Sequence, residues 1–405
     1  MINYLRLLVR NKGIKGIFYA LMKRLLEPAH ILIYKVCCLL PADKYLIVFR
    51  TQPDFADNGW ALWNYLNTCP DYSAYRFVWL VNNCRHFEGS KNTKFVPYDT
   101  IGLCIQAAYY LSRAHYVFFT HYVPPMVNSG RRICVNLCHG CGYKASKSKY
   151  AGESSFRYAM VTSSFFIEPQ SKFLGCDKKK ILPLGFPRND VLLHNIGNSS
   201  LNPIVQNLNF KKVILWMPTF RASYTLKYSE NSCDNETGLP VLDNEKAVYE
   251  FNEFLEALDV VMILKIHPMQ AEKDIFKKKL SHIIFVQDKD LVRRGLQLYQ
   301  IVGKTDALLT DYSSIAIDYI ILDKPMGFVI DDIDNYIKDR GFVFDDVLSL
   351  MPGDHIVNQS QLRDFATAVL DNRDPHKDWR HSVLNIMYDK VDDGSCRRIA
   401  EFLSF

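Results

Sequence analysis

The chain has 405 residues, of which 48% are hydrophobic, 13% aromatic and 23% charged, with a formal net charge of +6. This length is enough for two domains with separate cores, and the composition excludes wholesale disorder. The modest charge and the lack of a nucleic-acid-binding module argue against nucleic acid as a partner. Eleven cysteines, scattered without a regular framework, predict a reducing compartment rather than a disulfide-stapled secreted domain.

Most of the basic excess lies in residues 1–40, which contain seven Lys or Arg residues and a single acidic residue, Glu27. Apolar residues between these cations predict an amphipathic helix on an anionic membrane surface, with an ordinary surface helix as the alternative. The apolar stretch 29–40 is interrupted by Lys35 and is shorter than the roughly 20 residues of a transmembrane helix. No signal-peptide cleavage site follows Pro41, so we expect a peripheral protein on the cytoplasmic face of a membrane.

Beyond this leader, short β-rich runs alternate with helical or loop segments, which predicts parallel sheets covered by helices. A stretch rich in Asn and Ser, residues 195–209, separates two series of expected strands. The first series includes residues 45–50, 76–81, 115–120 and 133–137. The second comprises residues 212–216, 260–266, 282–286, 307–310 and 326–330. The predicted organisation is a leader (1–40), two α/β domains (41–200 and 206–358) and a helical tail (359–405).

Residues 310–314 form a polar turn between an apolar strand and an apolar helix. Thr310 or Asp311 can cap this helix, while Ser313 and Ser314 offer hydroxyls and backbone N–H groups at the positive end of its dipole. The segment therefore predicts a binding place for an anion such as a diphosphate, with a plain helix cap as the alternative.

Two histidines follow expected strands at the carboxyl edges of the sheets, where ligands lie in such folds. His267 can donate a hydrogen bond to a phosphate oxygen, or it can be satisfied by a neighbouring carbonyl. His139 precedes Gly140, which lets a substrate approach the backbone, and a neutral imidazole can deprotonate an attacking hydroxyl. No metal site is predicted, because the cysteines near His139 lack the spacing of a zinc knuckle and suit small buried side chains.

Two arginines complete the candidate site. Arg188 lies in a turn after Gly185, and Arg221 follows the expected strand 212–216. Arginine forks suit phosphate oxygens, although either residue alone could form a surface ion pair.

In this order, the segments resemble the CDP-glycerol glycerophosphotransferase family, the teichoic acid primases and polymerases of bacterial cell walls. The likeness runs from about Ile133 to about Asn358. It is carried by His139-Gly140 with Lys144, Gly185-Phe186-Pro187-Arg188-Asn189-Asp190, Pro218-Thr219-Phe220-Arg221, His267-Pro268, Thr310-Asp311-Tyr312-Ser313-Ser314, Asp339-Arg340-Gly341-Phe342 and Pro352-Gly353.

The resemblance implies an α/β, GT-B-like fold of two Rossmann-type domains facing a cleft, with the donor held mainly by the C-terminal domain. It implies that His139 deprotonates the acceptor hydroxyl, which attacks the distal phosphorus of CDP-glycerol and expels CMP, while His267 stabilises the diphosphate. Asp311 then orients its neighbours rather than binding a metal. The other residues implied are Arg188, Arg221, Thr310, Ser313, Ser314 and Arg340 for donor phosphates, and Gly140 and Lys144 on the acceptor side.

The expected function is thus transfer of glycerol phosphate to a membrane-linked acceptor in teichoic acid or capsule synthesis, without a cofactor. The family commonly has an Arg-Pro pair where this chain has Lys265-Ile266, and an aromatic and Thr-Pro where it has Cys138 and Cys141-Gly142. These departures leave CDP-ribitol open as the donor. A GT-B glycosyltransferase using a nucleotide sugar and a non-catalytic membrane assembly protein are the remaining alternatives.

Overall fold

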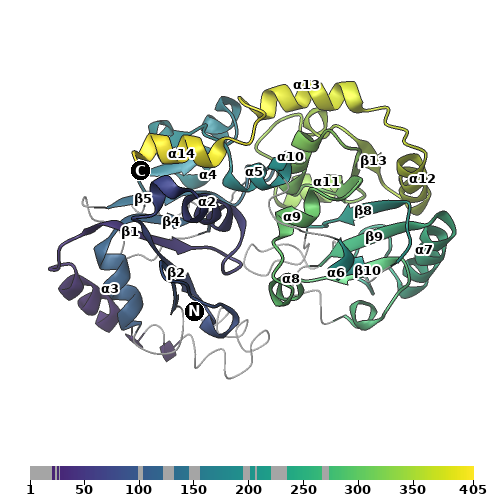
Figure 1. Cartoon of the computed structure of the whole chain (residues 1–405). Coiled ribbons are helices and arrows are strands. Elements are labelled where there is room, and N and C mark those ends of the chain that lie inside the picture. The colour runs from purple at the N-terminus through teal and green to yellow at the C-terminus, as the bar shows by residue number, and fades with distance from the viewer. Residues whose placement is uncertain are drawn as a thin grey trace. The chain divides into compact units, whose positions relative to one another are not determined.

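The computed structural model describes residues 21–22, 25–26, 28–98, 104–121, 132–145, 156–194, 201–205, 208–219, 235–266 and 273–405 (Figure 1). Most of the predicted basic leader lies outside these residues. The chain forms two compact units: unit 1 comprises residues 1–139, 152–160 and 405, and unit 2 comprises residues 140–151 and 161–404. The predicted linker at 195–209 follows the last strand of one sheet and precedes the first strand of the other, and the predicted domain limits stay a prediction.

A parallel sheet of seven strands in the described residues has the order β3-β2-β1-β4-β5-β6-β7. Its first strand, β1, lies inside the sheet and pairs in parallel with β2 and β4, and most of β1 is buried. Near-continuous apolar runs of this kind are typical of strands covered on both faces. The strands are β1 (Asp43–Arg50), β2 (Arg76–Val81), β3 (Thr93–Pro97), β4 (Ala114–Phe119), β5 (Ile133–Asn136), β6 (Tyr158–Met160) and β7 (Ile181–Leu182); the helices α2 (Asp57–Thr68) and α3 (Ile105–Arg113) connect the early ones.

A second parallel sheet has six strands in the described residues, in the order β10-β9-β8-β11-β12-β13. Both sheets start at an inner strand, extend to one side and then cross over to the other, as in Rossmann folds. The Rossmann-type prediction is therefore confirmed for both. The strands are β8 (Lys212–Trp216), β9 (Val260–Lys265), β10 (Ile283–Val286), β11 (Ala307–Thr310), β12 (Met326–Val329) and β13 (Asp354–Ile356).

Helix α7 (Glu245–Leu258) shows how the second sheet acquires its cover. The side chain of Asn244 accepts a hydrogen bond from the Ala247 N–H and so caps the helix. One face of the helix then buries Val248, Phe251 and Leu255 in the core. Burial of side chains of this size contributes about 1.5–3 kcal/mol each.

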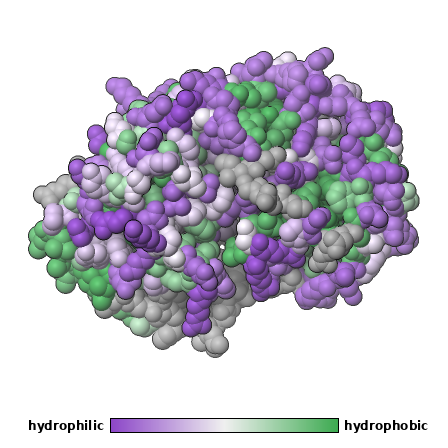
Figure 2. Space-filling model, in the orientation of Figure 1, coloured by the Kyte–Doolittle hydropathy of each residue, from purple (hydrophilic) through white to green (hydrophobic). Residues whose placement is uncertain are grey.

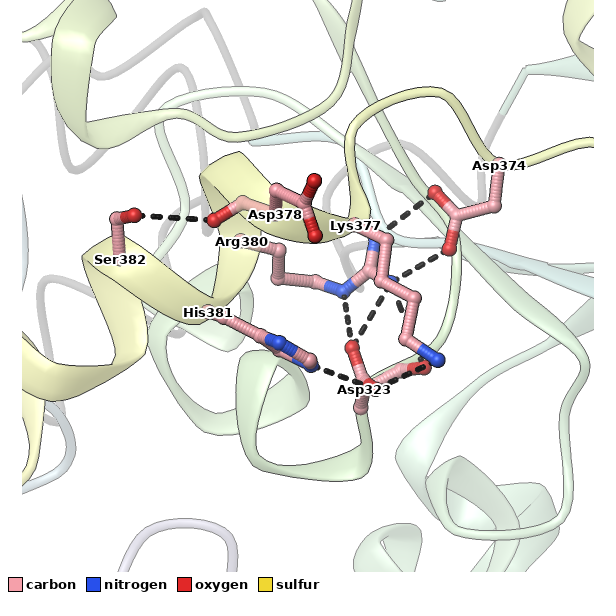
Figure 3. A network of polar contacts seen from close by, with 7 residues as sticks. All are labelled: Asp323, Asp374, Lys377, Asp378, Arg380, His381 and Ser382. Atoms are coloured by element: carbon pink, nitrogen blue, oxygen red, sulfur yellow. Dashed lines mark hydrogen bonds and ion pairs between the residues drawn. The ribbon is translucent and has the colours of Figure 1, made fainter.

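The chain ends in three helices, α12 (Gln359–Leu370), α13 (Lys377–Met387) and α14 (Ser395–Leu403). Helix α13 is attached to unit 2 through Arg380, whose side chain is fully buried. Its guanidinium contacts Asp323 at 2.9 Å and Asp374 at 2.5 Å, and His381 also reaches Asp323 (Figure 3). Removing one partner of a buried ion pair leaves an uncompensated charge, so this cluster fixes α13.

We expect Asp323→Asn to destabilise the protein by about 1–3 kcal/mol at neutral pH, because Arg380 loses a charged partner. Burial acts to raise the pKa of Asp323, but hydrogen bonds from His381 and Arg380 outweigh it and hold that pKa below its ordinary value. The carboxylate therefore stabilises the fold above the unfolded pKa, and this contribution is lost as pH falls through the folded pKa. Urea unfolding measures this effect: the difference in the free energy of unfolding between wild type and variant should become smaller at acidic pH. A difference independent of pH would contradict this role, and Asp378→Asn, an exposed change on α13, is the control.

Residues 28–37 form a helix whose buried side is fixed to unit 1: the Arg132 guanidinium donates to the Tyr34 hydroxyl at 3.0 Å. The other side exposes apolar residues, and Figure 2 shows a hydrophobic patch at the lower left, over this dark purple helix of Figure 1. Across the described residues, we find no helix with the length and apolar character needed to span a bilayer. The exposed apolar residues of this segment are Leu21, Leu25, Ile31, Leu32, Val36, Leu39 and Leu40.

Candidate active site

Several of the motifs singled out in the sequence, including Gly140, Arg188 and Ser314, come together in unit 2. Gly140 follows β5 and has a φ of +140°, which strongly favours glycine. A Cβ at this position would lie 2.6 Å from the Ser314 hydroxyl oxygen and 3.0 Å from Nη2 of Arg188. The backbone of Gly140 thus packs directly against two predicted donor-binding residues, and no larger side chain fits.

Arg188 is placed there by a buried ion pair. In helix α5 (Pro187–His194), its Nη2 donates to Oδ2 of Asp318 at 2.7 Å, and the two side chains are only 3% and 1% exposed. The hydroxyl of Tyr299 donates to the same oxygen at 2.7 Å. The guanidinium predicted to bind phosphate is thus engaged inside the protein, where it fixes α5 beside α10 (Ile315–Tyr319).

Asp318 and Tyr299 are site residues that the sequence-based prediction missed. Asp318 carried a usable signal, because it is the single acid in the apolar run 315–322. Charged residues are almost never fully buried unless they are paired. An acid within a predicted buried helix therefore indicates a buried cation elsewhere in the chain, although it does not indicate which one.

The next residues of the same motif anchor the last helix of the chain. Oδ1 and Oδ2 of Asp190 accept hydrogen bonds from the backbone N–H groups of Ser395 and Cys396 at 3.0 and 2.8 Å. Burial raises the pKa of Asp190, and these hydrogen bonds oppose that shift. Asp190 thus holds the start of α14. This role in the fold accounts for the Asp190 position of the motif without a contact to substrate.

Thr310 and Asp311, at the end of β11, organise the loop that follows β8. The Thr310 hydroxyl donates to the Met217 carbonyl at 2.8 Å. The two carboxylate oxygens of Asp311 accept the N–H and the hydroxyl of Thr219 at 2.6 and 2.5 Å. Lys144 Nζ donates to the same Thr219 hydroxyl at 2.9 Å. Asp311 therefore orients Thr219. Ser313 and Ser314, which follow in the same turn, are half-buried.

The segment after Gly140 also pairs with the predicted Asp339–Phe342 motif. Lys144 forms an antiparallel bridge with Phe342, and the N–H of Val343 donates to the Tyr143 carbonyl at 2.8 Å. Arg340 Nε donates to the Ala145 carbonyl at 3.2 Å. This pairing brings two motifs nearly 200 residues apart in the sequence to one place.

His139 is exposed in unit 1, and its ring stacks on that of His121 with centroids 4.4 Å apart. The backbone before it is rigidly held, since Asn58 Nδ2 donates to the carbonyls of Leu137 and Cys138 at 3.1 and 2.9 Å. An exposed imidazole on a fixed backbone suits proton transfer. His121 and Asn58 were not predicted as site residues. The position of His121, two residues after the end of β4, is the signal that could have indicated it.

His267 and Arg221 lie outside the described residues. Within the described ranges, no group of His, Cys, Asp and Glu residues is arranged to hold a metal ion. The cysteines near His139 are buried, as expected from their size and spacing.

Solved structures with the same architecture identify the fold. One structure of the wall teichoic acid polymerase TagF matches with a TM-score of 0.71 and 20% identity, covering 100% of this chain and 98% of that one. A putative UDP-N-acetylglucosamine 2-epimerase from Listeria monocytogenes matches with a TM-score of 0.53 and 14% identity, over 90% and 98% of the two chains. The two Rossmann sheets thus define a GT-B-like α/β fold, as predicted.

The family follows from sequence comparison. The family model described as CDP-glycerol:poly(glycerophosphate) glycerophosphotransferase matches residues 32–404, and the chain belongs to that family. A teichoic acid glycerol-phosphate transferase from Staphylococcus aureus is 27% identical, covering 92% of this chain and 96% of its own length. A teichoic acid ribitol-phosphate primase from Bacillus spizizenii is 25% identical, covering 73% and 76%. The predicted class, a transferase of teichoic acid synthesis acting on a CDP-polyol, is confirmed at this level.

Proposed function

We propose that the protein transfers glycerol phosphate from CDP-glycerol to a membrane-linked acceptor, with release of CMP, in the synthesis of teichoic acid or a related capsular polymer. The observation that carries this proposal is the convergence of Gly140, Lys144, Thr219, Ser314 and Arg340 in unit 2. The similarity to a glycerol-phosphate transferase over nearly the whole chain supports glycerol as the polyol.

In the proposed reaction, His139 accepts the proton of the acceptor hydroxyl, and the resulting oxygen attacks the distal phosphorus of the donor. A new P–O bond forms to the acceptor, the bond from that phosphorus to the bridging oxygen breaks, and CMP leaves with the electron pair. The exposed position of His139 on a backbone held by Asn58 supports its role as the base.

As the diphosphate is cleaved, negative charge develops on the phosphate of the departing CMP and needs fixed donors. Ser313 and Ser314 are half-buried, and Ser314 lies next to the Gly140 backbone. Both serines are proposed to hold the diphosphate together with Arg340. Lys144 is proposed to lie on the acceptor side, fixed by its hydrogen bond to Thr219. Roles for His267 and Arg221 in further charge stabilisation follow from the family motif. Arg188 is proposed to position the same site through its buried ion pair with Asp318.

Transfer can be followed directly with CDP-glycerol labelled at the distal phosphorus. We expect the label to appear in the lipid-linked product and CMP to remain unlabelled. Label released as free glycerol phosphate in the presence of acceptor would indicate hydrolysis and contradict the proposed transfer. CDP-ribitol, offered in parallel, tests the second candidate donor, which the similarity to the ribitol-phosphate primase favours.

We further propose that the protein lies on the inner face of the membrane through the apolar side of its N-terminal helix. Leu32 and Val36 are 63% and 56% exposed and four residues apart in the helix formed by residues 28–37, so they lie on one face of that helix. Apolar residues of this kind insert at the lipid interface, where nearby cations are attracted to anionic headgroups.

Replacing Leu32 and Val36 together by serine is expected to weaken binding to anionic vesicles by about tenfold or more, because each substitution removes an apolar side chain from the lipid interface. Cosedimentation with phosphatidylglycerol vesicles measures this loss. The matched control is Val357→Ser, which removes an apolar side chain that is 48% exposed in unit 2. Unchanged vesicle binding of the double variant would place the membrane contact elsewhere.

A further inference from the structure

A cavity lies in unit 1, at the amino-terminal ends of strands β2 and β3. It has a volume of about 480 Å³, is partly open to solvent, and is lined by the starts of these strands, the loop that joins them, and Tyr110 of α3. Sites for small ligands typically have volumes of about 300–1,000 Å³. Because the family motifs follow the carboxyl ends of strands, this cavity is separate from the candidate active site.

The lining of the cavity is cationic. Arg76, Lys91 and Lys94 contribute to it, and none of the described residues that line it is Asp or Glu. Asp43, outside the lining, pairs with Arg76, whereas Lys94 donates to the neutral Tyr110 hydroxyl at 3.1 Å. The positive charges of Lys91 and Lys94 are thus not offset by an ion pair with any described residue.

The rim that carries Lys91 is a fixed turn. The N–H of Ser90 donates to the Thr93 carbonyl at 2.8 Å, and its hydroxyl donates to Asn92 Oδ1 at 2.9 Å. Asn92 Nδ2 in turn donates to Asn67 Oδ1 of α2 at 2.9 Å. A rim fixed in this way loses little conformational entropy when a ligand binds.

The floor of the cavity is apolar, with the buried side chains of Leu46, Phe77 and Val78 from the first two strands. The combination of an apolar floor with two lysines on one side suits a flexible anion that has a carbon backbone. Lysine binds phosphate as a point charge, and two lysines in one cavity can bind two successive phosphates of a chain.

We infer that this cavity binds the polyol-phosphate chain of the acceptor or product, as a site remote from the reacting groups. The inference rests on the proposed function, because a chain of phosphodiesters is the polymer that this reaction extends. Lys91 and Lys94 contact the phosphates, and the floor contacts the polyol carbons. A site of this kind raises the affinity for long acceptors over short ones without taking part in the chemistry.

Binding of a synthetic glycerol-phosphate oligomer to the full-length protein, measured by calorimetry, tests the inference. We expect the double variant Lys91→Gln, Lys94→Gln to bind the oligomer at least tenfold more weakly than wild type. The wild-type affinity should also fall as salt is added, because exposed charges are screened. The matched control is the double variant Lys289→Gln, Lys390→Gln, which removes the same charge from exposed positions in unit 2 and should bind like wild type.

Kinetics separate this inference from the proposed function. With CDP-glycerol and a single-unit acceptor, the cavity variant should release CMP at the wild-type rate. With a long polymer acceptor its KM should rise while kcat stays unchanged. Oligomer binding and polymer KM equal to wild type would overturn the inference even if CMP release confirms the reaction. Loss of binding to phosphatidylglycerol vesicles with unchanged oligomer binding would assign the cavity to a lipid headgroup and also overturn it.

Discussion

His139→Ala is expected to lower the turnover number for acceptor-dependent CMP release by about 10²–10⁴-fold, the usual contribution of a general base. Binding of CDP-glycerol should be nearly unchanged, because the proposed donor contacts are made by other residues, Ser313, Ser314 and Arg340 among them. Rates of CMP release and calorimetric titration with the donor measure the two effects separately. Added imidazole should restore part of the lost activity, since it supplies a base in place of the missing ring.

The matched control is His194→Ala, a substitution of an exposed histidine that pairs with Asp393 on the surface of unit 2. This variant should retain wild-type turnover and donor affinity. Equal activity of His139→Ala and wild type would remove His139 as the base. His121, whose ring stacks on His139, would then be the nearest candidate for that role.

Asp318→Ala is expected to lower the free energy of unfolding by about 3–5 kcal/mol, because it leaves the buried Arg188 guanidinium without its carboxylate partner. The Tyr299 hydroxyl loses its acceptor in the same variant. Denaturant unfolding at neutral pH measures the change. Since Arg188 packs against Gly140, protein that still folds should also bind CDP-glycerol more weakly.

A second substitution distinguishes a lost ion pair from simple loss of packing. In the Asp318→Ala background, Arg188→Met removes the unpaired buried charge and should recover part of the lost stability. The reason is that replacing a buried ion pair by apolar residues often changes stability little. Glu168→Ala, which breaks exposed pairs with Lys172 and Lys178, is the control and should change stability much less. A double variant less stable than Asp318→Ala alone would contradict the ion-pair account.

The architecture could be predicted largely from the sequence, because buried parallel strands appear as apolar runs. The runs at 212–216 and 307–310 coincide with β8 and β11. The strands that were missed are short or lie near sheet edges, such as β7 (Ile181–Leu182) and β13 (Asp354–Ile356). In such strands, pairing with a neighbour decides the conformation, and the residues themselves carry little signal.

The candidate site was predicted in its parts, whereas the pairing of those parts was not. Residues at strand ends, such as Thr310 and Gly140, can be placed from the order of strands and turns. The burial of Arg188 could not be predicted, because arginine is rarely buried and its partner Asp318 lies 130 residues away. The contact of Gly140 with Ser314 likewise depends on how the elements of unit 2 pack.

The most direct test of the proposed reaction is CMP release by the purified protein offered CDP-glycerol, CDP-ribitol and a panel of nucleotide sugars, with and without a lipid-linked acceptor. We expect CMP from CDP-glycerol only when the acceptor is present, and no turnover of nucleotide sugars. Acceptor-dependent turnover of CDP-ribitol alone would keep the reaction class and change the donor. Turnover of a nucleotide sugar without CMP release from either CDP-polyol would contradict the proposed function.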